Sequence, residues 1–281
     1  MPDPTRLLKT LRQATRAFHD TPGRVGHLVQ LAGAADVLVT GDLHGNVENF
    51  RRLLERAELR SHPDRHLVFQ ELVHGPFEYP TGGDKSHQAI DVLAALKCQF
   101  PRQVHMLLGN HELAQWTNQW IGKGDTDLND WFRRGVESAY GGHANKIYEA
   151  YLDFFAAVPW AVRTSNRVFL SHSLPRAACM EQFKPEVLTS DDVHPGDLIP
   201  GGQIHSLVWG RDTTAVNAAD FLKKVDSDWL ITGHIPCEQG FATPNDRQLI
   251  LDCLGEPAAF CLFPAERTVT FQDLIDGVKT L

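Results

Sequence analysis

Short apolar runs alternate along the chain with longer stretches in which apolar residues recur at helical spacing. Strands are predicted at about 36–42, 67–69, 104–108, 167–171, 229–232, 249–253, 260–263 and 269–271. Helices are predicted over 46–59, 86–100, 217–225 and most of 5–31. Strands that alternate with helices favour an α/β fold.

We expect one domain over residues 1–281, because no linker, repeat or low-complexity tract divides the chain. Residues 1–33 are predicted to form an N-terminal helical extension. Residues 113–157 are rich in Trp and Tyr, and two glycines at 141–142 interrupt the helical pattern there. This segment is predicted to form a helical cap beside the functional site.

Metal-binding chemistry is indicated where the first long strand ends, because Asp42 and His44 lie two residues apart. Residues i and i+2 of an extended strand point to the same side, so a carboxylate oxygen and an imidazole nitrogen can converge on one ion. The apolar run 104–108 is followed by Gly109, Asn110, His111 and Glu112. The amide oxygen of Asn110 is also a suitable ligand for a hard divalent ion.

Two further histidines, His172 and His234, follow strand-like runs. Taken together and in this order, these motifs resemble the calcineurin-like metallophosphoesterases, and within them the phosphoprotein phosphatase branch. The resemblance extends from about residue 36 to about residue 252, and Trp-Gly-Arg at 209–211 stands where that family has a tryptophan-containing loop. It implies a four-layer sandwich of two mixed β-sheets packed face to face, with helices outside.

The resemblance also implies a binuclear centre of two divalent metal ions. Mixed oxygen and nitrogen ligands without thiolate suit Mn²⁺, Fe or Zn²⁺. The expected ligands of the first ion are Asp42, His44 and Glu71, and those of the second are Glu71, Asn110, His172 and His234.

In such a centre a hydroxide that bridges the ions would attack phosphorus, while His111 protonates the leaving-group oxygen. Glu112 is expected to fix the geometry beside His111. Asn110 and Arg211 are expected to contact the phosphoryl group, the arginine through two hydrogen bonds.

The second motif departs from the family, in which two aspartates stand in Gly-Asp-x-x-Asp-Arg-Gly. Here Glu71 occupies the position of the metal-bridging aspartate, and His74 occupies that of the aspartate that orients the catalytic histidine. An alternative alignment makes Asp84 the bridging ligand. Glu71 is preferred because it directly follows an apolar strand, whereas Asp84 follows a loop rich in proline and glycine.

Two arginines that bind phosphate in the family are missing, one after the second motif and one at the position of Leu108. The loop 76–88 precedes a predicted helix, whose N-terminal N–H groups attract anions. We therefore expect Lys85 of this loop to restore the lost charge, together with Asp84 or His87.

The leading functional hypothesis is a metal-dependent phosphomonoesterase that acts on phosphoserine or phosphothreonine, or on a small phosphorylated metabolite. A second hypothesis keeps this chemistry with a dinucleoside polyphosphate or a cyclic nucleotide as substrate. A third, of another class, is a metal-binding regulatory or scaffolding protein whose activity declined through the changes at Glu71 and His74.

Charge and hydropathy narrow the possible partners. The net charge of −8 and the pI of about 5.9 argue against general affinity for nucleic acid or anionic membranes. No stretch approaches the roughly 20 apolar residues of a membrane span, and the start lacks a signal-peptide pattern. We therefore expect a cytoplasmic protein; its oligomeric state is not predicted.

Overall fold

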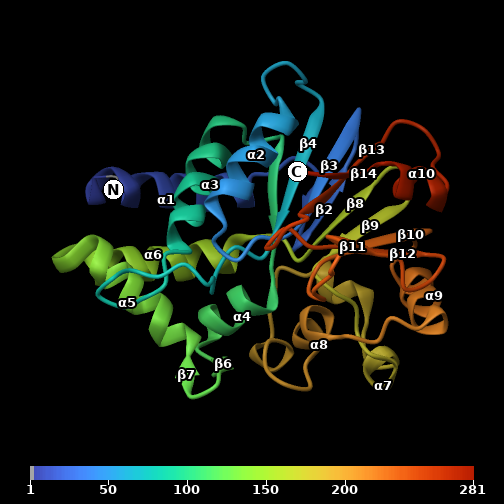
Figure 1. Cartoon of the computed structure of the whole chain (residues 1–281). Coiled ribbons are helices and arrows are strands. Elements are labelled where there is room, and N and C mark those ends of the chain that lie inside the picture. Colours follow the sequence, from blue (N-terminus) through green and yellow to red (C-terminus); the bar gives the residue numbers. More distant parts are fainter. Residues whose placement is uncertain (1–2) are drawn as a thin grey trace.

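The computed structural model describes residues 3–281, the side chain of Lys123 excepted, and contains two mixed β-sheets packed face to face (Figure 1). The smaller sheet has five strands in the order β14-β13-β3-β4-β5. Their bounds are β3 Asp36–Asp42, β4 Arg65–Gln70, β5 Val104–Leu107, β13 Ala259–Pro264 and β14 Val278–Thr280. Strands β3, β4 and β5 run parallel, so their carboxyl ends lie at the same edge.

The larger sheet has seven strands in the order β1-β2-β8-β9-β10-β12-β11. Their bounds are β1 Arg24–Val25, β2 Leu28–Leu31, β8 Ala161–Thr164, β9 Val168–Ser171, β10 Trp229–Thr232, β11 Phe241–Ala242 and β12 Gln248–Leu251. Strands β9, β10 and β12 are parallel. This sheet therefore also presents the carboxyl ends of three neighbouring strands at one edge.

Helices cover the outer faces of both sheets (Figure 1). They are α1 Pro4–His19, α2 Val47–Ala57, α3 His87–Gln99, α4 Asn110–Thr117, α5 Leu128–Tyr140, α6 Ala144–Ala157, α7 Ala177–Met180, α8 Gln203–Trp209, α9 Ala215–Lys224 and α10 Phe271–Asp276. Short 3₁₀ helices span Gly141–His143, Pro185–Leu188 and Pro195–Asp197, and β6 Gly122–Lys123 pairs with β7 Thr126–Asp127. The α/β class and the layered arrangement expected from sequence are confirmed.

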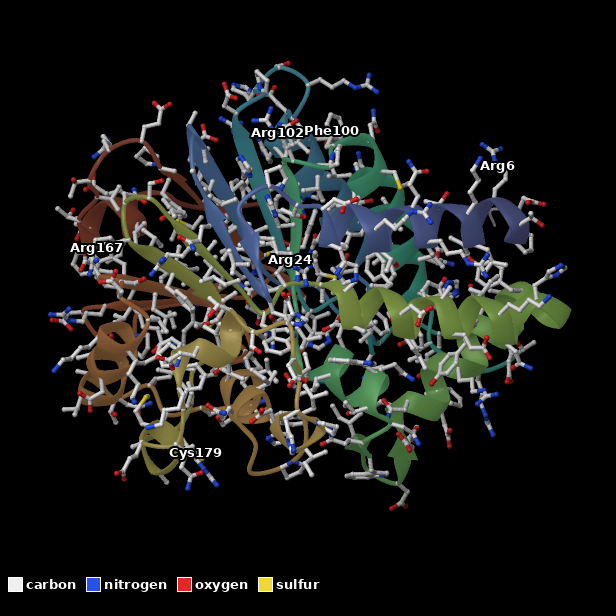
Figure 2. All side chains as sticks on the ribbon, turned by 180° about the vertical axis from the view of Figure 1, so that it is seen from behind. Arg6, Arg24, Phe100, Arg102, Arg167 and Cys179 are labelled. Carbon is white, nitrogen blue, oxygen red and sulfur yellow. The ribbon has the colours of Figure 1, made fainter. Side chains whose placement is uncertain are left out.

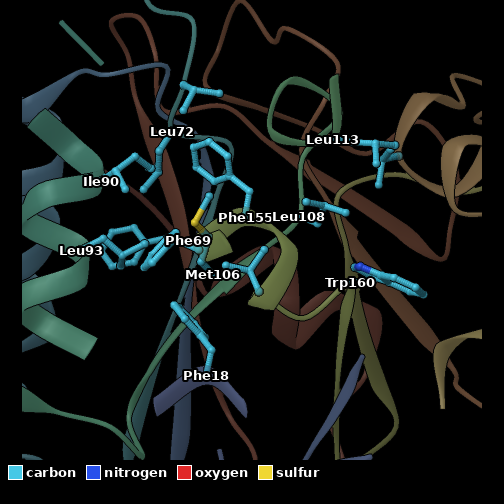
Figure 3. Close-up of a cluster of buried hydrophobic side chains, with 14 of the residues drawn as sticks. Phe18, Phe69, Leu72, Ile90, Leu93, Met106, Leu108, Leu113, Phe155 and Trp160 are labelled. Carbon is cyan, nitrogen blue, oxygen red and sulfur yellow. The ribbon is translucent and has the colours of Figure 1, made fainter. Parts of the chain in front are cut away.

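Alternation along the strands divides the core. In β3, Val37 and Val39 join the apolar layer between the sheets, whereas Leu38 joins the layer beneath the helices. This two-residue period is what a strand buried on both faces requires. Figure 3 shows the helix-side layer, in which Phe69 of β4 lies with Ile90 and Leu93 of α3.

The N-terminal segment differs in part from the expected helical extension. Helix α1 ends at His19, and residues 24–31 form the strands β1 and β2. Arg24, labelled in Figure 2, donates hydrogen bonds to the carbonyls of Phe18 and Ala157, at the ends of α1 and α6. The predicted strand at 269–271 is also wrong, because the chain enters α10 at Phe271 and the edge strand β14 follows.

The helical cap segment has two different parts. The hairpin β6–β7 and the start of α5 line a cavity, whereas Phe154 and Phe155 of α6 are fully buried in the core. The break between α5 and α6 falls at Gly141, which has a positive φ of 49°. Only the first part therefore lies beside the site described below.

No helix within residues 3–281 has both the length and the apolar character needed to cross a membrane.

Candidate metal centre

The carboxyl ends of the parallel strands from the two sheets meet at one place. Asp42, the last residue of β3, forms a β-bridge with Asp252, which directly follows β12. Open sheets bind ligands beyond the carboxyl ends of their strands. The strand order thus brings together residues that are up to 210 positions apart in sequence (42 to 252).

Most residues singled out by the sequence lie at this junction. Glu71 directly follows β4, Asn110 begins α4 just after β5, and His172 directly follows β9. His234 lies two residues after β10, and its backbone N–H donates to Asp42 Oδ2 at 2.7 Å. His44 follows Asp42 at the end of β3.

The carboxylate of Glu71 faces two groups of donor atoms. Its Oε1 lies 3.1 Å from His44 Nε2 and 3.8 Å from His111 Nε2. Its Oε2 lies 3.1 Å from His172 Nε2, which is in turn 2.9 Å from Asn110 Oδ1. Glu71 therefore belongs to two candidate ligand sets, one with His44 and His111 and one with Asp42 and His172.

The donor atoms fit a divalent metal ion. Asp42 Oδ1 and His172 Nδ1 are buried and have no hydrogen-bond partner among the described residues, although they lie 3.6 Å apart. An unpaired buried polar atom costs about 1–3 kcal/mol. Carboxylate and amide oxygens with imidazole nitrogens, and no thiolate, suit Mn²⁺, Fe or Zn²⁺.

The electrostatics of the cluster suit metal binding as well. Burial raises the pKa of Asp42 well above its ordinary value, and the charge of Glu71 adds to this effect. Burial opposes ionisation of Glu71 too, but the imidazoles of His111, His172 and His44 lower its pKa well below the usual range. Burial lowers the pKa of His234 to about 3. A neutral imidazole has a free lone pair for a metal ion.

Backbone strain is concentrated in the same cluster. His44, Glu71, His74 and His234 adopt positive φ angles of 42°, 31°, 62° and 68°. Such conformations cost non-glycine residues about 1–3 kcal/mol each and tend to cluster at functional sites. The rest of the fold therefore holds these four residues in backbone conformations that are unfavourable in free energy.

Two glycines allow the close approach of the carboxylates. A Cβ atom at Gly109 would lie 2.4 Å from Glu71 Oε2, and one at Gly233 would lie 2.2 Å from Asp42 Oδ1. Any side chain at either position would displace a carboxylate, because non-bonded heavy atoms pack at about 3.5–4.0 Å.

Glu112 ties two elements of the site together. Its Oε1 accepts hydrogen bonds from Leu72 N and Val73 N at 2.8 and 3.1 Å, and its Oε2 accepts one from Gly109 N at 3.2 Å. The loop after β4 is thereby fixed to the start of α4. Burial, with a contribution from Glu71, raises the pKa of Glu112 to about 8.

His111 and His74 contact each other beside the carboxylate of Glu71. Their Nδ1 atoms are 2.9 Å apart, and His111 N donates to Glu71 Oε2 at 3.1 Å. Burial lowers the pKa of His111 well below its ordinary value and that of His74 to about 4.

The other expected site residues lie at different distances from the cluster. Arg211 lines the cavity and donates from Nε to His234 Nε2 at 3.1 Å. The carboxylate of Asp84 accepts hydrogen bonds from Gly75 and Ser86 and is in neither ligand set. The Lys85 ammonium lies 5.2 Å from the centre of the Tyr79 ring, and Lys85 does not line the cavity.

A cavity of about 490 Å³ opens beside the cluster. The cap contributes Leu128 and Trp131 to its wall, and the loop after β4 contributes Glu78. Asp252 also lines it, although the sequence analysis did not single this residue out. Asp252 directly follows the apolar run that forms β12, and an acidic residue in that position is a signal that could have identified it.

Comparison with known proteins agrees with this geometry. Residues 35–238 match the model of the calcineurin-like phosphoesterase family. A probable serine/threonine-protein phosphatase of Encephalitozoon cuniculi is 26% identical over 240 residues, which cover 80% of this chain and 48% of that protein. The chain thus spans about half the length of this curated relative.

Solved structures share the fold at low sequence identity. A Saccharomyces cerevisiae protein serine/threonine phosphatase with similarity to human phosphatase PP5 superposes with a TM-score of 0.73 at 14% identity, covering 100% of this chain and 89% of the other. A cold-active protein-tyrosine phosphatase of a psychrophilic Shewanella species superposes with a TM-score of 0.58 at 14% identity, covering 91% of this chain and 82% of the other. Since the family match itself covers most of the sequence, this chain belongs to the calcineurin-like phosphoesterase family.

Proposed function

We propose that this chain is a metal-dependent phosphatase that hydrolyses phosphomonoesters at a binuclear centre. The observation that carries the proposal is the position of Glu71, whose two carboxylate oxygens face separate sets of metal donors. A carboxylate with this placement suits two neighbouring ions. Membership of the calcineurin-like phosphoesterase family supports the same chemistry.

The residues present would hold two divalent ions, Mn²⁺, Fe or Zn²⁺. Glu71 would contribute to both ions. The family resemblance assigns Asp42 and His44 to one ion and Asn110, His172 and His234 to the other. By distance, His44 instead lies with His111, and Asp42 lies with His172. When bound, such ions supply Lewis acidity and lower the pKa of bound water so that hydroxide forms near neutral pH.

The protein's own side chains would then orient the substrate and transfer a proton. Arg211 is held through Nε by His234, which leaves its two Nη groups to donate to phosphoryl oxygens. His111 directs Nε2 toward Glu71 and the cavity. As an imidazolium, with hydrogens on both ring nitrogens, it would protonate the leaving-group oxygen from Nε2. His74 contacts the other nitrogen of that ring and keeps it oriented.

Cavity size and charge favour a single phosphoryl group on the substrate. A volume of about 490 Å³ suits a small phosphorylated metabolite or one phosphorylated side chain of a peptide. Among the described lining residues Arg211 is the only lysine or arginine, whereas Glu78 and Asp252 are acidic. This charge balance disfavours a dinucleoside polyphosphate, because like charges repel.

The test is hydrolysis of p-nitrophenyl phosphate by chelator-treated protein before and after Mn²⁺ is added. We expect activity only with the metal, and a loss of about 100- to 10,000-fold in kcat for His111→Ala. His143→Ala is the matched control, because His143 is exposed on a 3₁₀ helix away from the site. A phosphopeptide and diadenosine tetraphosphate, assayed alongside, would distinguish the substrate classes.

Bound metal without turnover of any of these phosphoesters would refute the proposal. That result would favour a metal-binding regulatory or scaffolding protein instead.

A further inference from the structure

A line of hydrogen bonds runs from His111 away from the metal centre. His111 Nδ1 lies 2.9 Å from His74 Nδ1, and His74 Nε2 lies 2.8 Å from Gln115 Oε1. Gln115 Nε2 then donates to Tyr148 Oη at 2.7 Å. The line connects the loop after β4 to α4 and then to α6.

The orientation of the Gln115 amide, with its oxygen toward His74 and its nitrogen toward Tyr148, determines where the hydrogens lie. An amide oxygen only accepts, so His74 Nε2 must carry the hydrogen that points to Gln115. A neutral imidazole has one N–H, and the other nitrogen, here His74 Nδ1, is an acceptor. His111 must therefore donate its Nδ1–H to His74.

We propose that Gln115 is a positioning residue for the reaction, because it holds His74 in the tautomer that accepts a hydrogen bond from His111. This inference rests on the proposed function. The resemblance to phosphoprotein phosphatases assigns an aspartate to the position of His74. A carboxylate is always an acceptor, whereas an imidazole accepts at Nδ1 only if something fixes its hydrogen on Nε2.

Burial makes Gln115 effective in this role. His74 is 8% exposed and Gln115 is 0% exposed, so water does not readily replace the amide. Loss of the amide would leave His74 Nε2 without a partner and would allow the hydrogen to move to Nδ1. Two Nδ1–H groups would then face each other at hydrogen-bond distance, and His111 would lose its orientation.

The decisive variant pair uses His74→Asp. An aspartate Oδ atom is as many bonds from the backbone as histidine Nδ1, so it offers His111 an acceptor at the same place. This acceptor has no tautomers and does not need Gln115. The loss of kcat caused by Gln115→Leu should therefore depend on which residue occupies position 74.

The experiment is a double-mutant cycle on the Mn²⁺-loaded protein, with p-nitrophenyl phosphate as substrate. In the His74 background we expect Gln115→Leu to lower kcat about 10- to 100-fold with little change in KM. In the His74→Asp background we expect less than about a threefold effect. Gln119→Leu is the control, because that amide bonds Thr117 and Leu198 instead. Equal losses in both backgrounds would overturn the inference.

Nitrogen NMR of histidine-labelled protein gives an independent readout that needs neither turnover nor a His74 variant. We expect His74 to show a protonated Nε2 and a bare Nδ1 in the wild type, and a mixture of tautomers in Gln115→Leu. A protonated Nδ1 in the wild type would also overturn the inference. If the wild type hydrolyses no phosphoester, the proposed function fails, and this spectrum still tests the tautomer.

Discussion

Lys97 shows how one residue can lower the stability of this fold. Its side chain is fully buried, and Nζ donates to Thr21 Oγ1 and to the carbonyls of Pro101 and Val104 at 2.8–2.9 Å. The ammonium group also lies 4.6 Å from the centre of the Phe18 ring. Burial, with a smaller contribution from Arg24, lowers the pKa of Lys97 to about 7. The folded state therefore releases this proton far more easily than the unfolded chain does.

This difference predicts a pH dependence. Between pH 7 and pH 10.5 the unfolded chain keeps a proton that folded Lys97 has lost, so the free energy of unfolding should rise with pH. The rise is at most about 1.4 kcal/mol per pH unit. Lys97→Met should lack it, and the exposed control Lys9→Met should retain it. Urea unfolding at several pH values is the measurement, and parallel curves for wild type and Lys97→Met would contradict the assignment.

At the scale of one element, the spacing of apolar residues in helix α1 determines which of its faces packs against the core. Leu7, Leu11, Ala14 and Phe18 are buried at helical spacing, and α1 packs against α3 and α6. Asp3 caps the helix by accepting a hydrogen bond from Arg6 N at 2.9 Å. The helix thus covers the core at α3 and α6 and contributes none of its described residues to the cavity beside the metal centre.

We expect Leu11→Ala to lower the free energy of unfolding by about 2–5 kcal/mol, because it opens a cavity in the packed face. The exposed neighbour Arg12→Ala should change it by less than about 0.5 kcal/mol. Chemical denaturation measures both variants. At temperatures where Leu11→Ala stays folded its kcat should equal that of the wild type, and a large loss of kcat would show that α1 also supports the site.

At the scale of the whole molecule, the proposed centre joins the two sheets. Asp42 and Glu71 come from the five-stranded sheet, whereas His172 and His234 follow strands of the seven-stranded sheet. Ions held by these residues would cross-link the sheets only in the folded state. Binding should therefore stabilise the chain as one cooperative unit.

We expect wild-type protein to unfold in a single thermal transition whose Tm rises when Mn²⁺ is added. At a metal concentration 100 times Kd the gain is about 2.7 kcal/mol. Glu71→Gln should lose most of the Tm increment, whereas Asp84→Asn should keep it even if its starting Tm is lower. Calorimetry with and without chelator measures the increment. The opposite pattern would identify Asp84 as the bridging ligand, and two separate transitions would contradict a single domain.

The sequence alone determined the local parts of this molecule. Short apolar runs identified most strands and helical spacing of apolar residues identified most helices, because these patterns reflect how each element buries its apolar side chains. The spacing of Asp42 and His44 after an apolar run marked the start of the site from neighbouring residues alone. Glu71, His172 and His234 were assigned because the order of the motifs along the chain resembles that of the calcineurin-like metallophosphoesterases.

Only the tertiary structure decided which side chains meet. Residues 28–31 became a strand because they pair with β8 across more than 130 residues of sequence, and residues 24–25 pair with them in turn. Local pattern does not reveal such long-range pairing. The partners of Glu71, the separate position of Asp84, and the contacts of His74 with His111 and Gln115 depend on sheet order and loop path. Convergence in space results from long-range strand pairing, and the residues on either side of a motif do not encode it.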